Sequence, residues 1–395
     1  MYHLPKIFTQ ILTPCFTICL GGFSAPGPNK FFASIYNDGK GAKITNGSWS
    51  AGYKPYSTRC RMYDSSLRDN FDNMLFVASA GNTGNDVPGR AMNTIGEPAS
   101  CKNTMAVGAS QSNGERIYTG DLGKDHLADF SSRGPTMDGR MKPECVAVGY
   151  TILAPRAHAS ENNKEDSYET FGTSFSAPVV SGSAALIRQY FEEGWFPCGS
   201  KGCNKAIYPS GALVKAVLMN GAQSLKAVQK VPSGPVTSQL REYDNNQGMG
   251  LVNLSKSIPI KNVNQLNAVV VNNRALRDGE TTTIVIKTKQ CSANDLSVTI
   301  SWYDPAGAAN CAQCLVNDLD LSVQKNGQRF YPNGKSTPDR TNNSERVRMT
   351  VKAGQEIEIT VKAHNLATES QKYSLIATGC FDLNSEKTTE GFVYC

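Results

Sequence analysis

The chain of 395 residues lacks three features that would point to particular classes of protein. No segment approaches the roughly 20 consecutive apolar residues of a membrane-spanning helix, so we predict no membrane span. No internal repeat or low-complexity linker is visible. The net charge is only +6, from 40 basic and 34 acidic side chains without a dense run. Nucleic-acid binding usually needs a clustered basic face, so we predict no nucleic-acid partner.

Cysteine, by contrast, is abundant. Twelve cysteines are more than a reduced cytosolic enzyme typically carries, and they favour an oxidising compartment with disulfides. CGSKGC offers Cys198 with Cys203, and CAQC offers Cys311 with Cys314. Zinc is the alternative for these four thiols, but it requires them to converge on one point. The two pairs fall in different predicted domains, which favours disulfides. Spacing alone does not give the pairing.

The first residues, MYHLPKIFTQILTPCFTICLGGFSA, resemble a secretory signal, with one early lysine, an apolar centre and small residues at the end. We therefore assign residues 1–28 to a leader that is either signal-like or unmatched, and predict a secreted or secretory-pathway protein. Sequons at Asn46, Asn253 and Asn342 permit glycosylation. Asn46 falls in an apparent core strand, which predicts that it is unmodified.

Residues 29–257 alternate strand-like and helix-like runs. The runs AKITNGSW, MLFVASAG and TMAVGAS read as buried strands; MYDSSLRDNFDN, SFSAPVVSGSAALIRQYF and GALVKAVLMNGA read as helices. Such alternation predicts an α/β domain in three layers, with a parallel sheet covered on both faces. Ligands of these sheets bind beyond the carboxyl ends of the strands. Asn82 follows one predicted strand directly, so it falls where chemistry is expected.

The hydrophobic period changes to two after about residue 265. Five runs alternate apolar and polar residues, among them Val298, Ile300 and Trp302, and turn signals such as Asn326-Gly327 separate them. This pattern predicts half-buried antiparallel strands in an all-β sandwich, with a jelly-roll-like fold, over residues 265–382. Residues 383–395 remain as a tail, and the polar stretch 258–267 marks the boundary.

A serine in the stretch FGTSFSAPVVSG has the surroundings of a nucleophile. Gly172 permits a tight turn, Thr173 could cap the following helix, and Ser174 would open it. The free N–H groups at a helix start favour developing negative charge. A serine near a helix start is also a common cap, so this motif alone leaves both interpretations open.

The rest of the chain resembles the subtilisin-like serine proteases (subtilases). GTSFSAP is similar to the nucleophile motif of that family, ASAGNTG to its oxyanion motif, and GAKITNGSWS to the strand that pairs with substrate. SVTISWYDPAG and CLVNDLDLSVQKNG resemble the β-rich C-terminal domain of one branch. The resemblance extends over roughly residues 29 to 380.

The resemblance implies a role for each matching residue. Ser174 would be the nucleophile, and the Asn82 amide would donate to the oxyanion, because acyl transfer by serine needs donors aimed at the developing charge. Two segments would form the walls of the primary pocket: Ser48, Trp49, Ser50, Ser79, Ala80 and Gly81. Small walls admit a large apolar side chain. The implied partners are protein or peptide substrates, and no cofactor is required.

The remaining triad members of the family have no match. The acid normally lies in a D-[ST]-G turn and the base in an H-G-T-H-like helix start, and neither motif occurs. The four histidines are His3, His126, His158 and His364, and none has the expected position. Removing a triad member leaves only about 10³–10⁴-fold catalysis over water. The sequence therefore predicts an inactive chain, and three explanations stay open: a fragment of an active protease, an inactive homologue, or elements supplied by another chain.

Two further points stay open at this level. Asp318 and Asp320 in NDLDL share a strand face and could bind Ca²⁺, although a solvated outer face is the simpler interpretation. The main prediction is a secreted serine endopeptidase with an incomplete catalytic domain. The alternatives are an inactive homologue that binds peptides or proteins, and an adhesion protein in which the β domain is the functional part.

Overall fold

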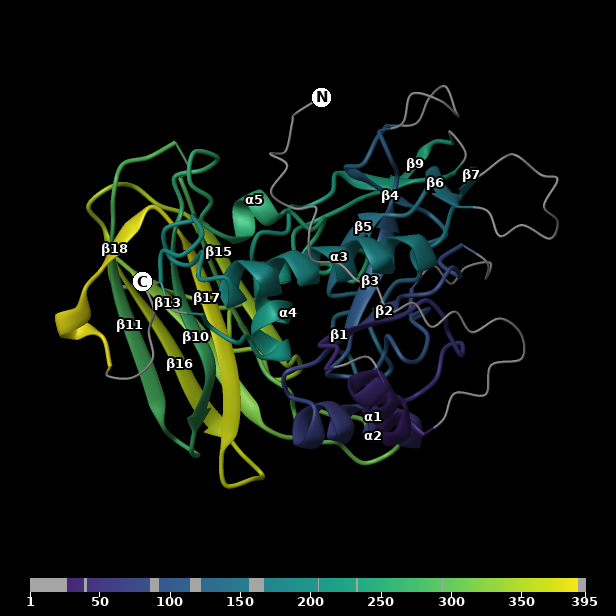
Figure 1. Ribbon diagram of the computed structural model, residues 1–395, viewed down its shortest axis with the longest axis horizontal. Coiled ribbons are helices and arrows are strands. Elements are labelled where there is room, and N and C mark those ends of the chain that lie inside the picture. Colours follow the sequence, from purple (N-terminus) through teal and green to yellow (C-terminus); the bar gives the residue numbers. More distant parts are fainter. Residues whose placement is uncertain are drawn as a thin grey trace.

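The computed structural model describes residues 27–38, 41–85, 92–113, 122–155, 167–204, 206–231, 234–292 and 294–389. An α/β unit and an all-β unit lie side by side in Figure 1. The signal-like leader, His3 and His158 lie outside the described residues, apart from the last two leader positions. No helix in the described ranges is both long and apolar enough to cross a membrane.

The α/β unit is built on a mixed sheet with the strand order β1-β2-β3-β4-β8-β9, in which β5 also pairs with β3. Four pairings are parallel: β1 with β2, β2 with β3, β3 with β5 and β4 with β8. Two pairings, β3 with β4 and β8 with β9, are antiparallel. The strands are β1 (Ile44–Gly47), β2 (Leu75–Ser79), β3 (Met105–Ser110), β4 (His126–Ala128), β5 (Cys145–Val148), β8 (Ala227–Gln229) and β9 (Val236–Gln239), with β6 (Ile152–Pro155) and β7 (Ser167–Thr170) forming a separate hairpin.

Helices cover both faces of this sheet. Leu75 and Val77 of β2 face a core shared with α3 (Thr173–Glu192) and α4 (Gly211–Asn220). Between them in the chain, Phe76 faces the opposite core, formed with α1 (Pro28–Asp38) and α2 (Thr58–Ser65). Alternate residues of a strand point to opposite faces, so the predicted three-layer arrangement is confirmed. The predicted helix at 62–73 begins earlier, where Ser57 caps α2, and continues as a π-helical turn η2 (Ser66–Asn70).

The all-β unit consists of two antiparallel sheets packed face to face. One has the order β10-β17-β12-β15 and the other β14-β13-β16-β11-β18. The apolar members of the five alternating runs all point into one core between them. Asn326 and Gly327 have positive φ angles of 51° and 77°, which makes the β13–β14 hairpin the tight turn that this dipeptide predicts. The strands are β10 (Asn267–Leu276), β11 (Thr281–Thr288), β12 (Asp295–Ser301), β13 (Asp318–Lys325), β14 (Gln328–Phe330), β15 (Ser344–Thr350), β16 (Glu356–Asn365), β17 (Gln371–Gly379) and β18 (Phe381–Leu383).

The two units share an interface. The outer face of the four-stranded sheet lies against α4, so that Val270 and Ile376 belong to the α/β core. Asn220, the last residue of α4, donates from Nδ2 to the Thr378 hydroxyl (2.7 Å) and accepts from that of Thr299 (2.9 Å). The short helix α5 (Leu254–Ser257) contacts α4 before the chain enters β10. Because sandwich strands complete the α/β core, the β unit is positioned to stabilise the α/β unit.

Eight of the nine cysteines in the described residues pair as disulfides, whereas Cys145 is a free, buried thiol. Four bridges are formed: Cys60–Cys101, Cys198–Cys203, Cys291–Cys380 and Cys311–Cys314. The disulfide interpretation of the two short-range pairs is thus confirmed over zinc. The expectation that Asn46 lies in a core strand is wrong, because β1 is an edge strand among the described residues and the Asn46 side chain is exposed. Asn342 is buried instead, and its Nδ2 donates to Asp339 (2.7 Å).

Candidate active site

Ser174 lies in the first turn of α3, next to the end of β1. Gly172 precedes the helix with a φ of 137°, a conformation that side chains rarely adopt. The Ser174 hydroxyl is half-buried and donates to the main-chain oxygen of Ser48 (3.4 Å). In return, the Ser48 hydroxyl donates to the main-chain oxygen of Ser174 (2.8 Å). This reciprocal pair ties the turn at the helix start to the carboxyl end of β1.

Asn82 lies in the turn after β2, directly beside the same helix start. Its Oδ1 accepts from the main-chain N–H of Thr173 (2.9 Å) and from the Thr173 hydroxyl (2.8 Å). Its side chain is exposed. Because Oδ1 is occupied by these two donors, the carboxamide orientation is set and Nδ2 is left as the group that can donate to a ligand. Residues 82 and 174 are therefore brought together at one edge of the sheet.

Thr173 is the residue whose role sequence reasoning missed. It was expected to cap α3, but Gly172 occupies the cap position and makes no side-chain cap bond. The fully buried Thr173 hydroxyl instead accepts from the Gly81 N–H (3.2 Å) and donates to Asn82. Its place next to the serine was the only available signal, since the contact spans 91 residues of chain.

The two predicted pocket segments lie on neighbouring strand ends. Ser48 and Ser50 are exposed, whereas Ser79, Ala80 and Gly81 are buried. The segment 94–97 links them, because the Ala51 N–H donates to the Glu97 oxygen (2.8 Å) and the Gly96 N–H to the Ala80 oxygen (3.1 Å). Trp49 differs from the expectation in one respect. Its ring packs against Phe31 and Phe76, with centroids 5.9 and 5.8 Å away, so it joins the aromatic core.

The two histidines in the described ranges lie on β4 and β16. His126 is buried on β4, where its Nδ1 lies 3.1 Å from the carboxylate of Asp125. His364 lies on β16 of the sandwich, 3.8 Å from the carboxylate of Asp320. Neither is a contact of the Ser174 hydroxyl among the residues that the structure describes. The described site thus contains a hydroxyl and amide donors without an imidazole.

The site geometry agrees with a family comparison. The model of the subtilase family matches residues 30–250, which is more than half of the chain. The chain belongs to the subtilase family. Its α/β unit with Ser174 at a helix start and Asn82 after β2 is the matched part, and the all-β unit follows the match.

The chain spans only 16% of the length of one Dictyostelium relative and 12% of the length of pyrolysin. It is 25% identical over 309 residues to the serine protease/ABC transporter B family protein tagB of Dictyostelium discoideum, covering 65% of the chain and 16% of the relative. It is 33% identical over 200 residues to pyrolysin of Pyrococcus furiosus, covering 47% of the chain and 12% of pyrolysin. Among solved structures, sphericase matches with 21% identity and a TM-score of 0.36, over 56% of the chain and 60% of sphericase.

The proposed calcium ligands lie in the all-β unit of the subtilase. Asp318 and Asp320 both pair with Arg340, whose Nη1 lies 3.2 Å from the Asp318 carboxylate. Burial raises the pKa of Asp318 to about 6, against the opposing effect of Arg340. Across the described ranges, no group of three or more His, Cys, Asp or Glu side chains is arranged to hold a metal ion. Calcium binding at Asp318 and Asp320 stays a prediction, and the ion would have to compete with the Arg340 guanidinium for the two carboxylates.

Proposed function

We propose that this subtilase chain carries the nucleophile and the oxyanion donors of a serine endopeptidase site. The observation that supports it is the pairing of Asn82 Oδ1 with Thr173, which fixes the Asn82 carboxamide against the residue that precedes Ser174. The substrate would be an extended polypeptide lying across Ser48–Ser50 and residues 79–81. Moderately broad specificity for large apolar side chains follows from the small residues in those segments.

The proposed chemistry is acyl transfer to serine. The Ser174 hydroxyl attacks the scissile carbonyl, and the carbonyl oxygen becomes an oxyanion in the tetrahedral intermediate. Asn82 Nδ2 and the Ser174 N–H at the start of α3 would donate to that oxygen. The positive end of the α3 dipole points the same way, because a helix N-terminus favours negative charge. These donors need no reorganisation, since Thr173 already holds Asn82.

The proton of Ser174 needs an acceptor, and the described residues place no imidazole there. We infer that the acid and base of a working site come from outside the described residues. The chain by itself would then react slowly through Ser174, because a hydroxyl is a poor nucleophile until a base accepts its proton. An external base should replace part of the missing function.

This inference has a direct test with a fluorophosphonate probe. We expect slow covalent labelling of the folded chain at Ser174 that accelerates as imidazole is added, because imidazole can accept the hydroxyl proton. Mass spectrometry of tryptic peptides identifies the labelled residue. Ser174→Ala should abolish labelling at every imidazole concentration. Ser183→Ala removes a hydroxyl from the same helix, where it donates to the Val179 oxygen (2.9 Å), and should label like the parent chain.

A folded chain that stays unlabelled at high imidazole, or that is labelled elsewhere, would remove the nucleophile assignment. The alternative would then be a homologue that binds peptides without cleaving them. Binding without cleavage needs no imidazole in the described site. It needs only a segment that can pair with a polypeptide, and the exposed Ser48 and Ser50 offer one.

The role of Thr173 gives a second prediction. Thr173→Val keeps the shape of this buried side chain but removes the hydroxyl that donates to Asn82 Oδ1. One hydrogen bond of about 1.4 kcal/mol corresponds to a factor of about ten in rate. We therefore expect the imidazole-dependent labelling rate to fall about ten-fold. Thr173→Ser should restore most of it, whereas a purely structural role would leave the rate of the folded valine variant unchanged.

We also propose that the protein is secreted or resides in the secretory lumen. The four disulfides support this, because such bridges persist in oxidising compartments. The sandwich would serve as a stabilising part of the enzyme, since its strands complete the α/β core. An independent adhesion role for the sandwich has no comparable support.

A further inference from the structure

One long loop of the sandwich crosses to the α/β unit. Residues 302–317, which we name the clasp loop, connect β12 to β13. Asn310 donates its N–H to the Tyr56 oxygen (2.7 Å) just before α2. The Tyr303 hydroxyl donates to the Met74 oxygen (2.6 Å) at the start of β2. The loop is thus held by main-chain groups of two elements of the α/β unit.

The clasp loop closes around the ammonium group of Lys102, which is completely buried. Lys102 Nζ donates to the carboxylate of Asp304, to the Pro305 oxygen and, at 2.8 Å, to the Cys314 oxygen. All three oxygens belong to the loop. A buried ammonium needs its oxygen partners, because an unpaired buried charge is costly. The conformation of the loop at Cys314 therefore determines whether Lys102 is fully satisfied.

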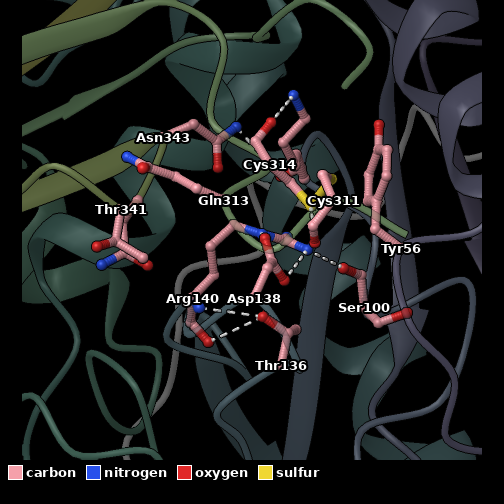
Figure 2. Close-up of polar contacts among 12 residues, drawn as sticks. Tyr56, Ser100, Thr136, Asp138, Arg140, Cys311, Gln313, Cys314, Thr341 and Asn343 are labelled. Carbon is pink, nitrogen blue, oxygen red and sulfur yellow. Dashed lines mark hydrogen bonds and ion pairs between the residues drawn. A yellow bond between two sulfur atoms is a disulfide. The ribbon is translucent and has the colours of Figure 1, made fainter. Parts of the chain in front are cut away.

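A disulfide fixes the loop at this point. Cys311 and Cys314 are bridged at a sequence separation of only three, and Figure 2 shows the bridge beside Tyr56, with Arg140 and Gln313 nearby. Both cysteines pack on the aromatic core that contains Phe32, Tyr56 and Tyr63. A ring of this size constrains the local backbone that presents the Cys314 oxygen. A bridge over so short a loop restricts the conformational entropy of the unfolded chain less than a bridge over a long loop does.

The bridge is also open to attack from solvent. Cys311 is half-buried, and Ala312 and Gln313 between the two cysteines are exposed. The neighbouring bridge in the same core, Cys60–Cys101, is different, because both of its cysteines are fully buried. Thiol–disulfide exchange requires access of the attacking thiolate to a sulfur atom. The two bridges of this core should therefore respond differently to a reductant.

We propose that the Cys311–Cys314 disulfide is a redox-sensitive latch that couples the sandwich to the α/β unit. A dithiol reductant attacks Cys311 Sγ, the S–S bond breaks, and Cys314 leaves as a thiolate that takes a proton. The second thiol of the reductant then displaces Cys311, which yields two protein thiols and the oxidised, disulfide form of the reductant. Reduction frees the Cys314 main chain and loosens its contact with Lys102. The latch operates whether or not Ser174 is a nucleophile.

Reduction of the latch should loosen the segment of residues 95–104. It contains Lys102, and its Gly96 N–H donates to Ala80 of one predicted pocket wall (3.1 Å), while its Glu97 oxygen accepts from Ala51, which directly follows the other wall (2.8 Å). Hydrogen exchange of this segment is therefore a readout of the latch. It is separate from catalysis and from the sulfur chemistry.

The experiment titrates the folded, oxidised chain with dithiothreitol and combines differential alkylation with hydrogen exchange. We expect Cys311 and Cys314 to become alkylated while Cys60 and Cys101 stay bridged. At that point, exchange within residues 95–104 should accelerate at least about ten-fold, because amide protection follows local opening. The Cys311→Ser/Cys314→Ser variant should show the accelerated exchange in residues 95–104 without reductant. Adding dithiothreitol should not accelerate exchange in that segment further.

The matched control is Cys198→Ser/Cys203→Ser, which removes the other short-range bridge, located after α3 at a sequence separation of five. It should leave exchange in residues 95–104 unchanged. The latch is refuted if Cys311–Cys314 is reduced only together with Cys60–Cys101, or if its reduction leaves exchange in that segment unaltered. The titration of the unmodified chain decides both points even if the double-serine variant fails to fold.

Discussion

Lys102→Met is expected to lower the free energy of unfolding by about 3–5 kcal/mol, the range for breaking a buried ion pair by removing one partner. The Lys102 and Asp304 side chains are both fully buried. Methionine fills the space of the lysine stem but leaves the Asp304 charge and the Cys314 and Pro305 oxygens without their common donor. Asp304 would keep only the main-chain N–H groups of Val316 (2.9 Å) and Asn317 (2.8 Å).

Chemical denaturation of the oxidised chain measures this loss, and two further variants separate charge from packing. Lys226→Met removes an ion pair of 2.5 Å with Asp125 at the surface, where the lysine side chain is 70% exposed. It should cost at most about 1 kcal/mol. Adding Asp304→Leu to Lys102→Met removes the stranded charge and should recover part of the loss. A Lys102→Met variant as stable as the surface control would show that the pair does not hold the two units together.

The Lys102–Asp304 pair also shows where sequence reasoning stops. The two residues are 202 positions apart, and the stretch SVTISWYDPAG that contains Asp304 carries no signal that points to Lys102. Local periodicity predicted the strands of the sandwich, because apolar residues alternate with polar ones along β13 and β16 and all face one core. A contact between two loops of different units leaves no such local signal. The sequence therefore does not predict that residues 302–317 contact the α/β unit.

In the proposed active site, too, the sequence predicted the local turns but not the contacts between distant segments. The motifs around Asn82 and Ser174 predicted two turns that lie side by side in the structure, because Asn82 accepts from Thr173 at the start of α3. They could not predict that the Thr173 hydroxyl would hold Asn82, because its orientation depends on packing between β2 and α3. Trp49 is the opposite case. Its motif position suggested a pocket wall, whereas the aromatic rings of Phe31 and Phe76 draw its side chain into the core.

A second buried cluster next to the interface predicts an unusual dependence of stability on pH. Lys142 and Lys215 both donate to the same oxygen of Glu144, at 2.5 and 2.8 Å. Burial lowers the pKa of Lys142 from 10.5 to about 7; Glu144 opposes this, while Lys215 and Arg140 add to it. The unfolded chain therefore holds one more proton than the folded chain between about pH 7 and about pH 10.5. Stability contributed by this group rises as the pH rises through that window.

We expect the free energy of unfolding to increase by about 2 kcal/mol from pH 6 to pH 8.5 through Lys142, since one unit of pKa corresponds to about 1.4 kcal/mol. The pH range of the measurement ends at 8.5 because of a second group. Burial also raises the pKa of the Cys145 thiol, so its ionisation in the unfolded chain opposes the trend at higher pH. Denaturation curves at constant ionic strength across this range provide the measurement.

Lys142→Met is the variant that isolates the effect, because it removes the titrating group and keeps the stem. Its unfolding free energy should change less between pH 6 and pH 8.5 than that of the parent chain, by about the same 2 kcal/mol. Lys226→Met again serves as the surface control and should keep the parent slope. If the parent and Lys142→Met curves ran parallel, Lys142 would be fully charged in the folded chain. Glu144 would then balance two buried ammonium groups throughout the neutral range, and the interface would carry a permanent excess of positive charge.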